Sequence, residues 1–264
     1  MKTNNLSIGI FDSGVGGTSI WKEIKALLPN ENTIYLSDSK NAPYGEKTKQ
    51  EIIDLSIKNT EFLLQQNCKL IIVACNTATT NAIKVLREKY SIPFIGIEPA
   101  IKPAALKTKT NIIGILATKG TLNSELFEKT SNTIRDQILI KEKIGKGLVE
   151  LIEDGKINSS EMKNLLNSYI EPMLGEDVDC LVLGCTHYPY LIPQIREIVG
   201  DKIQIIDSGE AVAKQTKAIL EKYELFNNDI EKGKHQFYIN KNKKVLEMLL
   251  PKDAQLIKIE EKKF

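Results

Sequence analysis

The feature that most constrains the fold is a motif that occurs twice, an apolar run followed by a cysteine. Such runs lead into Cys75 and into Cys185, so the two copies lie 110 residues apart. A second pair agrees, since residues 8–13 resemble residues 113–118 at an offset of 105 residues. Two matched pairs in the same order and at nearly the same offset indicate an internal duplication.

Each half of this duplication is expected to fold as an α/β unit. The run before each cysteine is short and apolar, which predicts a buried strand, and an amphipathic run follows it as a helix. We therefore expect two pseudo-symmetric three-layer α/β domains with mainly parallel sheets. Ligands bind at the carboxyl ends of the strands in such sheets. The active site should then lie in the cleft between the domains, with one cysteine from each.

The predicted domain boundaries follow from the comparable size of the two halves. The first domain is expected to contain residues 1–98, the second residues 99–208, and residues 209–264 should return to the first domain. Strands are expected at residues 7–11, 33–37, 71–74, 92–97, 111–116, 137–140, 180–184, 203–206, 236–239 and 255–259. Helices are expected up to residue 28 and at residues 47–66, 81–90, 123–131, 148–155, 160–174, 191–199 and 210–223.

Composition and charge exclude several classes of protein. The 264 residues are 42% hydrophobic and 27% charged, as in ordinary soluble proteins. The net charge is only +2 and charges of both signs are interspersed, so no nucleic-acid partner is expected. Neither a signal peptide nor an apolar run of 18 residues is visible, so no membrane partner is expected. Four cysteines without a dense framework favour free thiols in a reducing cytoplasm.

A glycine-rich turn, residues 12–18, follows the first predicted strand. It is similar to a dinucleotide-binding loop, but Ser19 stands where the fingerprint requires glycine or alanine. The Gly-Lys-Ser/Thr sequence of a nucleoside-triphosphate loop is also missing. We expect the glycines to bring backbone N–H groups close to a small anion instead.

Besides simple packing in the core, the two cysteines allow four kinds of chemistry. A disulfide is disfavoured in a reducing compartment, and the spacing of Cys185, His187 and His235 fits no common zinc site. A redox enzyme would normally carry a CxxC motif, which is absent. The fourth alternative is acid–base chemistry from two sides of one substrate. One thiol would remove a proton from carbon and the other would deliver a proton to the opposite face, as in a racemase or epimerase without cofactor or metal.

Polar groups next to the cysteines favour this fourth alternative. Asp12 and Ser13 end the first strand, and Thr186 and His187 follow the second cysteine. A carboxylate or an imidazole within hydrogen-bond reach can tune the pKa of a thiol. The helix that follows Cys75 is expected to lower the pKa of that thiol through its N-terminal partial charge.

Four motifs together closely resemble those of the glutamate racemases. They are Asp12-Ser13-Gly14-Val15-Gly16-Gly17, Pro43-Tyr44-Gly45, Ala74-Cys75-Asn76-Thr77-Ala78 and Gly184-Cys185-Thr186-His187-Tyr188-Pro189. They keep their order over essentially the whole chain. The resemblance implies a cofactor-independent isomerase that interconverts L- and D-glutamate and supplies D-glutamate for peptidoglycan. A cytoplasmic homodimer is expected.

The resemblance also implies roles for individual residues. Cys75 and Cys185 correspond to the two acid–base thiols, and Asp12 corresponds to the partner of Cys75. Glu153 and His187 correspond to partners of the second thiol. The stretch before Glu153 departs from the Ala-Cys-Pro-type sequence of many family members, and the alternative for this residue is a solvated carboxylate at a helix end. Substrate contacts are implied for Asp12, Ser13, Tyr44, Gly45, Asn76, Thr77, Thr118, Thr121, Thr186 and His187.

Two rival hypotheses remain. An aspartate racemase or a related isomerase would share the fold and both cysteines but would differ in the length of the pocket. A non-catalytic binding protein on the same scaffold would keep its ligand affinity after replacement of either cysteine.

Overall fold

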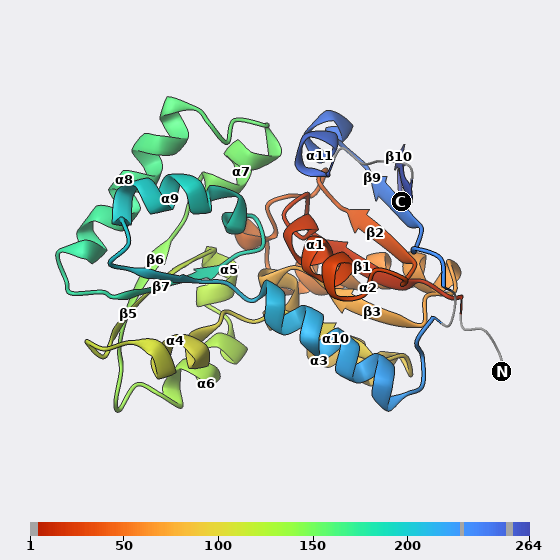
Figure 1. The fold of residues 1–264 in the computed structure, drawn as a ribbon, viewed down its shortest axis with the longest axis horizontal. Coiled ribbons are helices and arrows are strands. Elements are labelled where there is room, and N and C mark those ends of the chain that lie inside the picture. The colour runs from red at the N-terminus through yellow and green to blue at the C-terminus, as the bar shows by residue number, and fades with distance from the viewer. Residues whose placement is uncertain (1–4, 228–229, 252–255) are drawn as a thin grey trace.

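Two lobes, each built on one parallel β-sheet, make up the protein (Figure 1). The structure is a computed structural model that describes residues 5–227, 230–251 and 256–264. The sheet of the first lobe has the strand order β10-β9-β2-β1-β3-β4, and every pairing in it is parallel. Its strands are β1 (Ile8–Asp12), β2 (Thr33–Ser37), β3 (Leu70–Val73), β4 (Phe94–Gly96), β9 (His235–Ile239) and β10 (Ile257–Glu261).

The sheet of the second lobe repeats the central part of the first. Its order is β6-β5-β7-β8, again entirely parallel, and it corresponds strand by strand to β2-β1-β3-β4. The strands are β5 (Ile112–Ala117), β6 (Leu139–Ile144), β7 (Cys180–Gly184) and β8 (Gln204–Ile206). The expected fold, two α/β domains with parallel sheets, is confirmed.

Helices cover both faces of each sheet, because the central strands are buried on both sides and need apolar partners on both. In the first lobe, Ile10 and Phe11 point to opposite faces and belong to different core clusters. The first lobe carries α1 (Thr18–Leu27), α2 (Lys49–Gln65), α3 (Asn76–Lys89), α10 (Gly209–Lys222) and α11 (Lys243–Leu249). The second carries α4 (Ile101–Lys107), α5 (Lys119–Leu122), α6 (Glu125–Asn132), α7 (Leu148–Glu153), α8 (Ser160–Leu174) and α9 (Ile192–Val199), while short 3₁₀ turns η1 (Tyr44–Glu46) and η2 (Tyr188–Leu191) precede α2 and α9.

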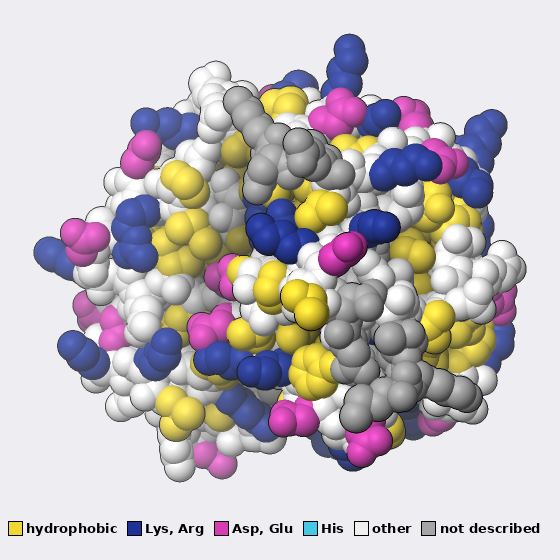
Figure 2. Space-filling view, turned by 45° about the vertical axis from the view of Figure 1, so that its right-hand side comes forward, with side chains coloured by type: hydrophobic (Ala, Val, Ile, Leu, Met, Phe, Trp, Pro, Cys, Tyr) yellow, Lys and Arg dark blue, Asp and Glu magenta, His cyan; other side chains and the backbone are white. Residues whose placement is uncertain are grey.

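One apolar cluster runs through both lobes. It contains Trp21 and Phe237 from the first lobe together with Leu183 and Ile195 from the second. The carboxyl ends of the two sheets are therefore held against each other by continuous packing. The surface outside this core mixes both signs of charge, and the face in Figure 2 shows basic and acidic side chains interspersed.

Several element boundaries differ from those predicted. The helix after Cys75 begins at Asn76 and not at residue 81, because the Cys75 sulfur caps it by accepting from the Ala78 N–H at 3.4 Å. Strand β6 lies at residues 139–144 and not 137–140. Helices α4 and α11 were not predicted, since both are only seven residues long. Strand β10 lies two residues later than expected, and Gln255 is outside the described residues.

We propose that the domains are residues 1–98 with 209–264, and residues 99–208. The tail strands β9 and β10 extend the first sheet beside β2, and α10 packs on α1. Helix α4 packs against β5 and β7 of the second sheet. Within the described part of the chain, no helix has the length and apolar character needed to cross a membrane.

A buried ion pair joins three segments of the first lobe. Lys69 Nζ lies 2.5 Å from Glu31 Oε2, and both side chains are almost fully buried. The other carboxylate oxygen of Glu31 accepts from the Asn227 N–H at 2.7 Å. The pair therefore links the start of β3 to the loop after α1 and to the segment after α10.

We expect Lys69→Met to lower the free energy of unfolding by about 3–5 kcal/mol, because it leaves a buried carboxylate without its counter-charge. Urea unfolding followed by circular dichroism measures this change. The control is Lys214→Met, which removes an exposed pair with Glu210 on α10 and should change the free energy of unfolding far less, because water and salt screen exposed charges. Equal effects of the two substitutions would show that the buried pair does not stabilise the fold.

Candidate active site

Strand register brings the predicted site residues of each lobe together. In the first lobe Phe11 pairs with Val73, so Asp12 and Cys75 follow at the same edge of the sheet. In the second lobe Ala117 pairs with Gly184, so Thr118 and Cys185 follow at the corresponding edge. These two edges face each other.

Both cysteines line one narrow cavity between the lobes. Seven of its lining residues belong to the first lobe and five to the second. It is lined by Ser13, Pro43, Tyr44, Gly45, Cys75, Asn76, Thr77, Thr118, Val149, Cys185, Thr186 and His187. Of the residues that the resemblance singled out, Asp12, Glu153 and Thr121 lie behind this wall and contact residues that form it.

Cys75 is a buried thiol at the N-terminus of α3. Its sulfur lies 3.4 Å from the Ala78 N–H and 3.6 Å from the Ser13 hydroxyl. Burial raises its pKa well above the usual value, and the negative charge of Asp12 raises it further. The predicted lowering of this pKa by the helix is therefore wrong, because desolvation of the thiolate outweighs the hydrogen bond that the helix supplies.

Asp12 is also fully buried, and its carboxylate holds the turn that follows β1. One oxygen accepts from the Ser13 N–H at 2.7 Å, and the other accepts from the Gly17 N–H at 2.6 Å and the Thr186 hydroxyl at 3.3 Å. Burial raises the pKa of Asp12, and the positive charge of His187 offsets this only in part. Asp12 thus connects the first lobe to Thr186, the residue beside the second cysteine.

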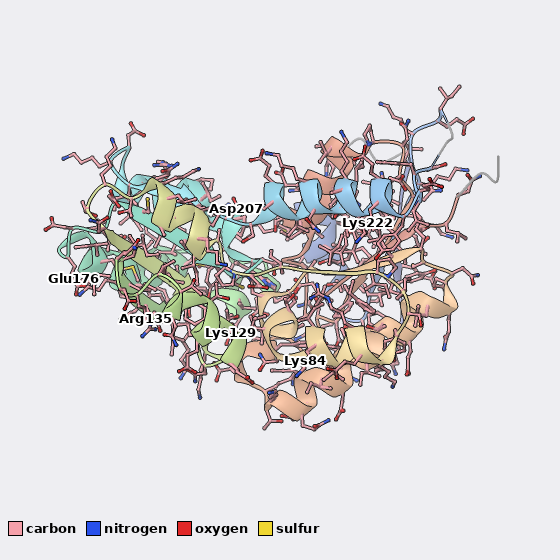
Figure 3. The ribbon with its side chains drawn as sticks, turned by 90° about the horizontal axis from the view of Figure 1, so that it is seen from below. Lys84, Lys129, Arg135, Glu176, Asp207 and Lys222 are labelled. Carbon is pink, nitrogen blue, oxygen red and sulfur yellow. The ribbon has the colours of Figure 1, made fainter. Side chains whose placement is uncertain are left out.

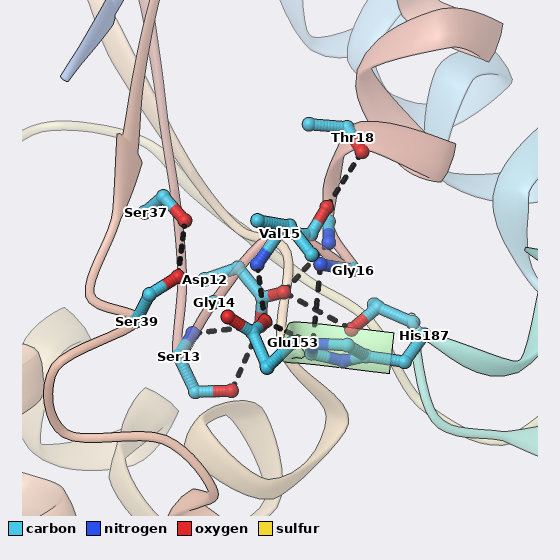
Figure 4. Close-up of polar contacts among 12 residues, drawn as sticks. Asp12, Ser13, Gly14, Val15, Gly16, Thr18, Ser37, Ser39, Glu153 and His187 are labelled. Atoms are coloured by element: carbon cyan, nitrogen blue, oxygen red, sulfur yellow. Dashed lines mark hydrogen bonds and ion pairs between the residues drawn. The ribbon is translucent and has the colours of Figure 1, made fainter. Parts of the chain in front are cut away.

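The second cysteine belongs to a three-residue chain of contacts. Cys185 Sγ lies 3.8 Å from His187 Nδ1, and His187 Nε2 lies 2.6 Å from Glu153 Oε1. The same carboxylate oxygen accepts from the Val15 N–H of the first lobe at 2.6 Å (Figure 4). Glu153 is thus a buried partner of His187 and not a solvated carboxylate at a helix end. Its catalytic role stays a prediction.

The contacts of His187 define its protonation. Burial alone would lower its pKa, but hydrogen bonds with Cys185 and Glu153 and the charges around it raise the pKa well above the usual value. Burial would raise the pKa of Glu153, but the hydrogen bond and charge of His187 lower it. Nε2 then carries a proton for Glu153, so the 3.3 Å contact with the Gly16 N–H is not a hydrogen bond accepted by the imidazole.

The glycine-rich turn serves this chain of contacts. A side chain at Gly14 would collide with the Glu153 carboxylate, and one at Gly16 would collide with the His187 ring. The predicted role of the turn, presenting N–H groups to a small anion, fits the structure in an unexpected way. The anions that it holds are carboxylates of the protein itself, Glu153 at Val15 and Asp12 at Gly17.

The polar groups of the predicted substrate contacts differ in the hydrogen bonds that they already make. Asn76 is buried, and within the described residues neither atom of its amide group has a hydrogen-bond partner. Hydroxyls of Thr77, Thr118 and Thr121 form a closed triangle of contacts at 2.8, 3.0 and 3.3 Å, which spans both lobes. Tyr44 differs, since its hydroxyl already donates to Asp38 at 2.6 Å.

Gly45 touches the second lobe, because a Cβ at this position would contact the Thr118 side chain.

Two other residues that line the cavity, Pro43 and Val149, were not predicted from the sequence as site residues. Pro43 could have been found as part of the Pro43-Tyr44-Gly45 motif. Val149 carries no signal, because an apolar residue on a predicted helix is ordinarily part of the core.

A larger and more open groove lies between α2, α3 and α6 and contains neither cysteine. Figure 3 labels Lys84 and Lys129 on the two helices at its sides. The chemistry therefore points to the narrower cavity. Among the described residues, no three His, Cys, Asp or Glu side chains are arranged to hold a metal ion; that activity needs no metal or cofactor stays a prediction.

The protonation of His187 can be measured directly, because the chain has only two histidines. Burial lowers the pKa of His235 to about 4, so in an NMR titration the imidazole that titrates above about 6.5 should be His187. Glu153→Gln should lower the pKa of His187, since it removes the carboxylate that stabilises the imidazolium. Glu150→Gln on the same helix is the control and should leave it unchanged. A His187 that titrates below 6.5 would contradict the proposed imidazolium.

Comparison with known proteins agrees with this geometry. The sequence model of the Asp/Glu/Hydantoin racemase family matches residues 8–216. The glutamate racemase of Ectopseudomonas mendocina is 41% identical over 260 residues, which cover 97% of this chain and 99% of that protein. The crystal structure of a glutamate racemase isoform from Bacillus anthracis has a TM-score of 0.86 at 30% identity and covers 98% of this chain and 97% of its own. That of Francisella tularensis glutamate racemase in complex with D-glutamate has a TM-score of 0.84 at 29% identity and covers 98% of each chain. The chain therefore belongs to the Asp/Glu/Hydantoin racemase family and to the glutamate racemases within it.

Proposed function

We propose that this protein is a glutamate racemase that interconverts L- and D-glutamate without a cofactor, with Cys75 and Cys185 as its two acid–base groups. The observation that carries the proposal is that each lobe contributes one cysteine to the same enclosed cavity. Similarity to glutamate racemases over almost the whole chain supports glutamate as the substrate.

The reaction needs one proton acceptor and one proton donor on opposite faces of the α-carbon. From L-glutamate, the thiolate of Cys185 takes the α-proton and the C–H electron pair stays on the substrate as a carbanion. The thiol of Cys75 then gives its proton to the other face, and D-glutamate forms. After this turnover Cys185 carries a proton and Cys75 is a thiolate. This is the state from which the reverse reaction, from D-glutamate, starts.

The surroundings suit the two thiols to these unequal starting states. The imidazolium of His187 lies beside Cys185 and stabilises a thiolate there. Burial and the nearby Asp12 carboxylate keep the proton on Cys75. The enzyme form with its proton on Cys75 is the one that accepts L-glutamate in this scheme.

The substrate is expected to bind through neutral polar groups. Asn76, with its unbonded amide, lines the cavity together with the hydroxyl residues Ser13, Thr77, Thr118 and Thr186. Gly45 offers only its backbone, and Tyr44 also lines the cavity. Thr121 is expected to act by holding the hydroxyls of Thr77 and Thr118.

The wider role follows from the family. We propose that the D-glutamate formed is used for peptidoglycan synthesis and that the enzyme works in the cytoplasm, where its four free and buried cysteines stay reduced. A homodimer is also proposed. Exposed apolar side chains such as Leu106 and Leu139 on the second lobe are compatible with such an interface.

The proposal is tested by circular dichroism of L-glutamate, D-glutamate, L-aspartate and D-aspartate with purified protein and no added cofactor. Both glutamate signals should decay to zero and neither aspartate signal should change. In heavy water, early product should carry deuterium at its α-carbon while recovered substrate stays largely unlabelled, because each thiol holds one exchangeable proton. Decay of the aspartate signals instead would identify an aspartate racemase.

Cys75→Ala and Cys185→Ala should each abolish racemisation, because a proton removed from one face could not be replaced from the other. Cys68→Ala and Cys180→Ala are matched controls, since both residues are buried cysteines outside the cavity. Removal of one acid–base group typically lowers a rate by about 10²–10⁴-fold. The two-thiol mechanism is therefore wrong if either cavity variant keeps more than roughly a few per cent of the wild-type rate. Ligand affinity that survives both substitutions without any turnover in the wild type would indicate a binding protein.

Asp12→Asn should lower kcat more than it changes KM, because the charge beside Cys75 governs the transfer of its proton. General acid–base groups typically contribute about 10²–10⁴-fold to the rate, and the loss is expected in this range. Steady-state kinetics in both directions measure it. Near-normal turnover would leave Asp12 only a structural role in the turn that ends at Gly17.

A further inference from the structure

A buried tyrosine of the first lobe lies at the far end of the contacts that lead to Cys185. The Val15 N–H donates to Glu153 Oε1, as described above, and the carbonyl of the same peptide group belongs to Gly14. This carbonyl accepts a hydrogen bond from the Tyr35 hydroxyl at 2.9 Å. One peptide group thus connects Tyr35 on β2 with Glu153 on α7, which is the partner of His187.

We propose that Tyr35 is a positioning residue for the Cys185 half of the reaction. It holds the Gly14–Val15 peptide so that the N–H of this peptide fixes and polarises the Glu153 carboxylate. This inference rests on the proposed function and deepens it, because it assigns a role to a residue that does not touch the cavity.

The peptide needs such a holder because it lies next to glycine. Gly14 has no side chain, since one would collide with Glu153, and glycine leaves the adjacent peptide free to rotate. Rotation would point the carbonyl, and not the N–H, at the carboxylate. The Tyr35 hydroxyl opposes this rotation by fixing the carbonyl on the opposite side. The carbonyl of the next residue, Val15, accepts a hydrogen bond from the Thr18 hydroxyl at 2.6 Å.

Tyr35 is itself held rigidly. Its side chain is fully buried, and the centroid of its ring lies 5.3 Å from the ring centroid of Phe237 on β9. In the sheet it pairs with Ile10 on one side and with Phe237 on the other. The hydroxyl therefore reaches Gly14 from a fixed position in the core. Because hydrogen bonds in a chain polarise one another, the bond from Tyr35 also strengthens the one from Val15 to Glu153.

The proposal predicts a larger effect on one thiol than on the other. The path of hydrogen bonds runs through Glu153 and His187 to Cys185, whereas the sulfur of Cys75 contacts Ser13 and the Ala78 N–H. The Tyr35 hydroxyl also lies near Asp12, because a Cβ on Gly17 would lie 2.8 Å from both side chains. Loss of the hydroxyl should therefore raise the barrier for the proton transfer at Cys185 more than the barrier for the transfer at Cys75.

Tyr35→Phe tests this, since it removes the hydroxyl and keeps the ring. Catalytic efficiency, kcat/KM, should fall about 10-fold, and equally from both enantiomers, because L- and D-glutamate have equal free energies. The primary isotope effects should separate. With α-deuterated L-glutamate the isotope effect should rise, because transfer at Cys185 now limits the rate. With α-deuterated D-glutamate the isotope effect should fall toward one, because the proton transfer at Cys75 then limits the rate less.

Tyr188→Phe is the matched control. Tyr188 is also fully buried, and its hydroxyl also donates to a glycine carbonyl, that of Gly145 at 3.1 Å. In the described part of the chain no hydrogen bond joins this peptide to Glu153, so Tyr188→Phe should not move the two isotope effects in opposite directions. Comparison of the two variants removes the general effect of losing a buried tyrosine hydroxyl.

The histidine titration gives a second and independent readout. In Tyr35→Phe the pKa of His187 should fall toward its usual value, because Glu153 is held and polarised less well, while Tyr188→Phe should leave it in place. An unchanged ratio of isotope effects together with an unchanged His187 pKa overturns the proposal. If the wild type does not racemise glutamate, the proposed function fails, and the titration still decides whether Tyr35 positions the Glu153–His187 pair.

Discussion

The buried contact between Glu153 and His187 is the interaction on which the site depends. The two residues come from the second lobe, yet the carboxylate is completed by the Val15 N–H of the first. A buried charge without partners is strongly unfavourable, so this arrangement requires the lobes to stay in contact. It also requires glycines in the turn after β1, because a Cβ at Gly14 or Gly16 would occupy the space of the pair.

The same burial makes the two halves of the duplication chemically different. Both lobes place a cysteine after an equivalent strand, β3 in one and β7 in the other. Cys75 caps a helix and lies near a carboxylate, whereas Cys185 lies near an imidazolium and is followed by a 3₁₀ turn. The proposed reaction needs one proton donor and one proton acceptor at any moment, and the unequal surroundings suit the two thiols to these roles.

Much of the site followed from sequence patterns, because parallel strands place their carboxyl ends at one edge. Asp12, Cys75 and Cys185 lie where the periodicity and the duplication put them. The helix after Cys75 was predicted five residues too late, since four of the residues at 76–80 are Asn or Thr, which are weak helix formers that the cap and the tertiary contacts nevertheless keep helical. Tyr35 gave no signal, as a tyrosine in a buried strand normally only packs.

The sequence by itself determined the alternation of strands and helices, the duplication and the residue types of the site, because these depend on local periodicity and on motif spacing. The tertiary structure alone decided the electrostatics. Val15 and Glu153 are 138 residues apart in the chain, and no local pattern predicts that a glycine turn binds this carboxylate. Burial, which depends on all the surrounding elements, and the nearby charge of Asp12 raise the pKa of Cys75, where its place at a helix N-terminus predicted a fall.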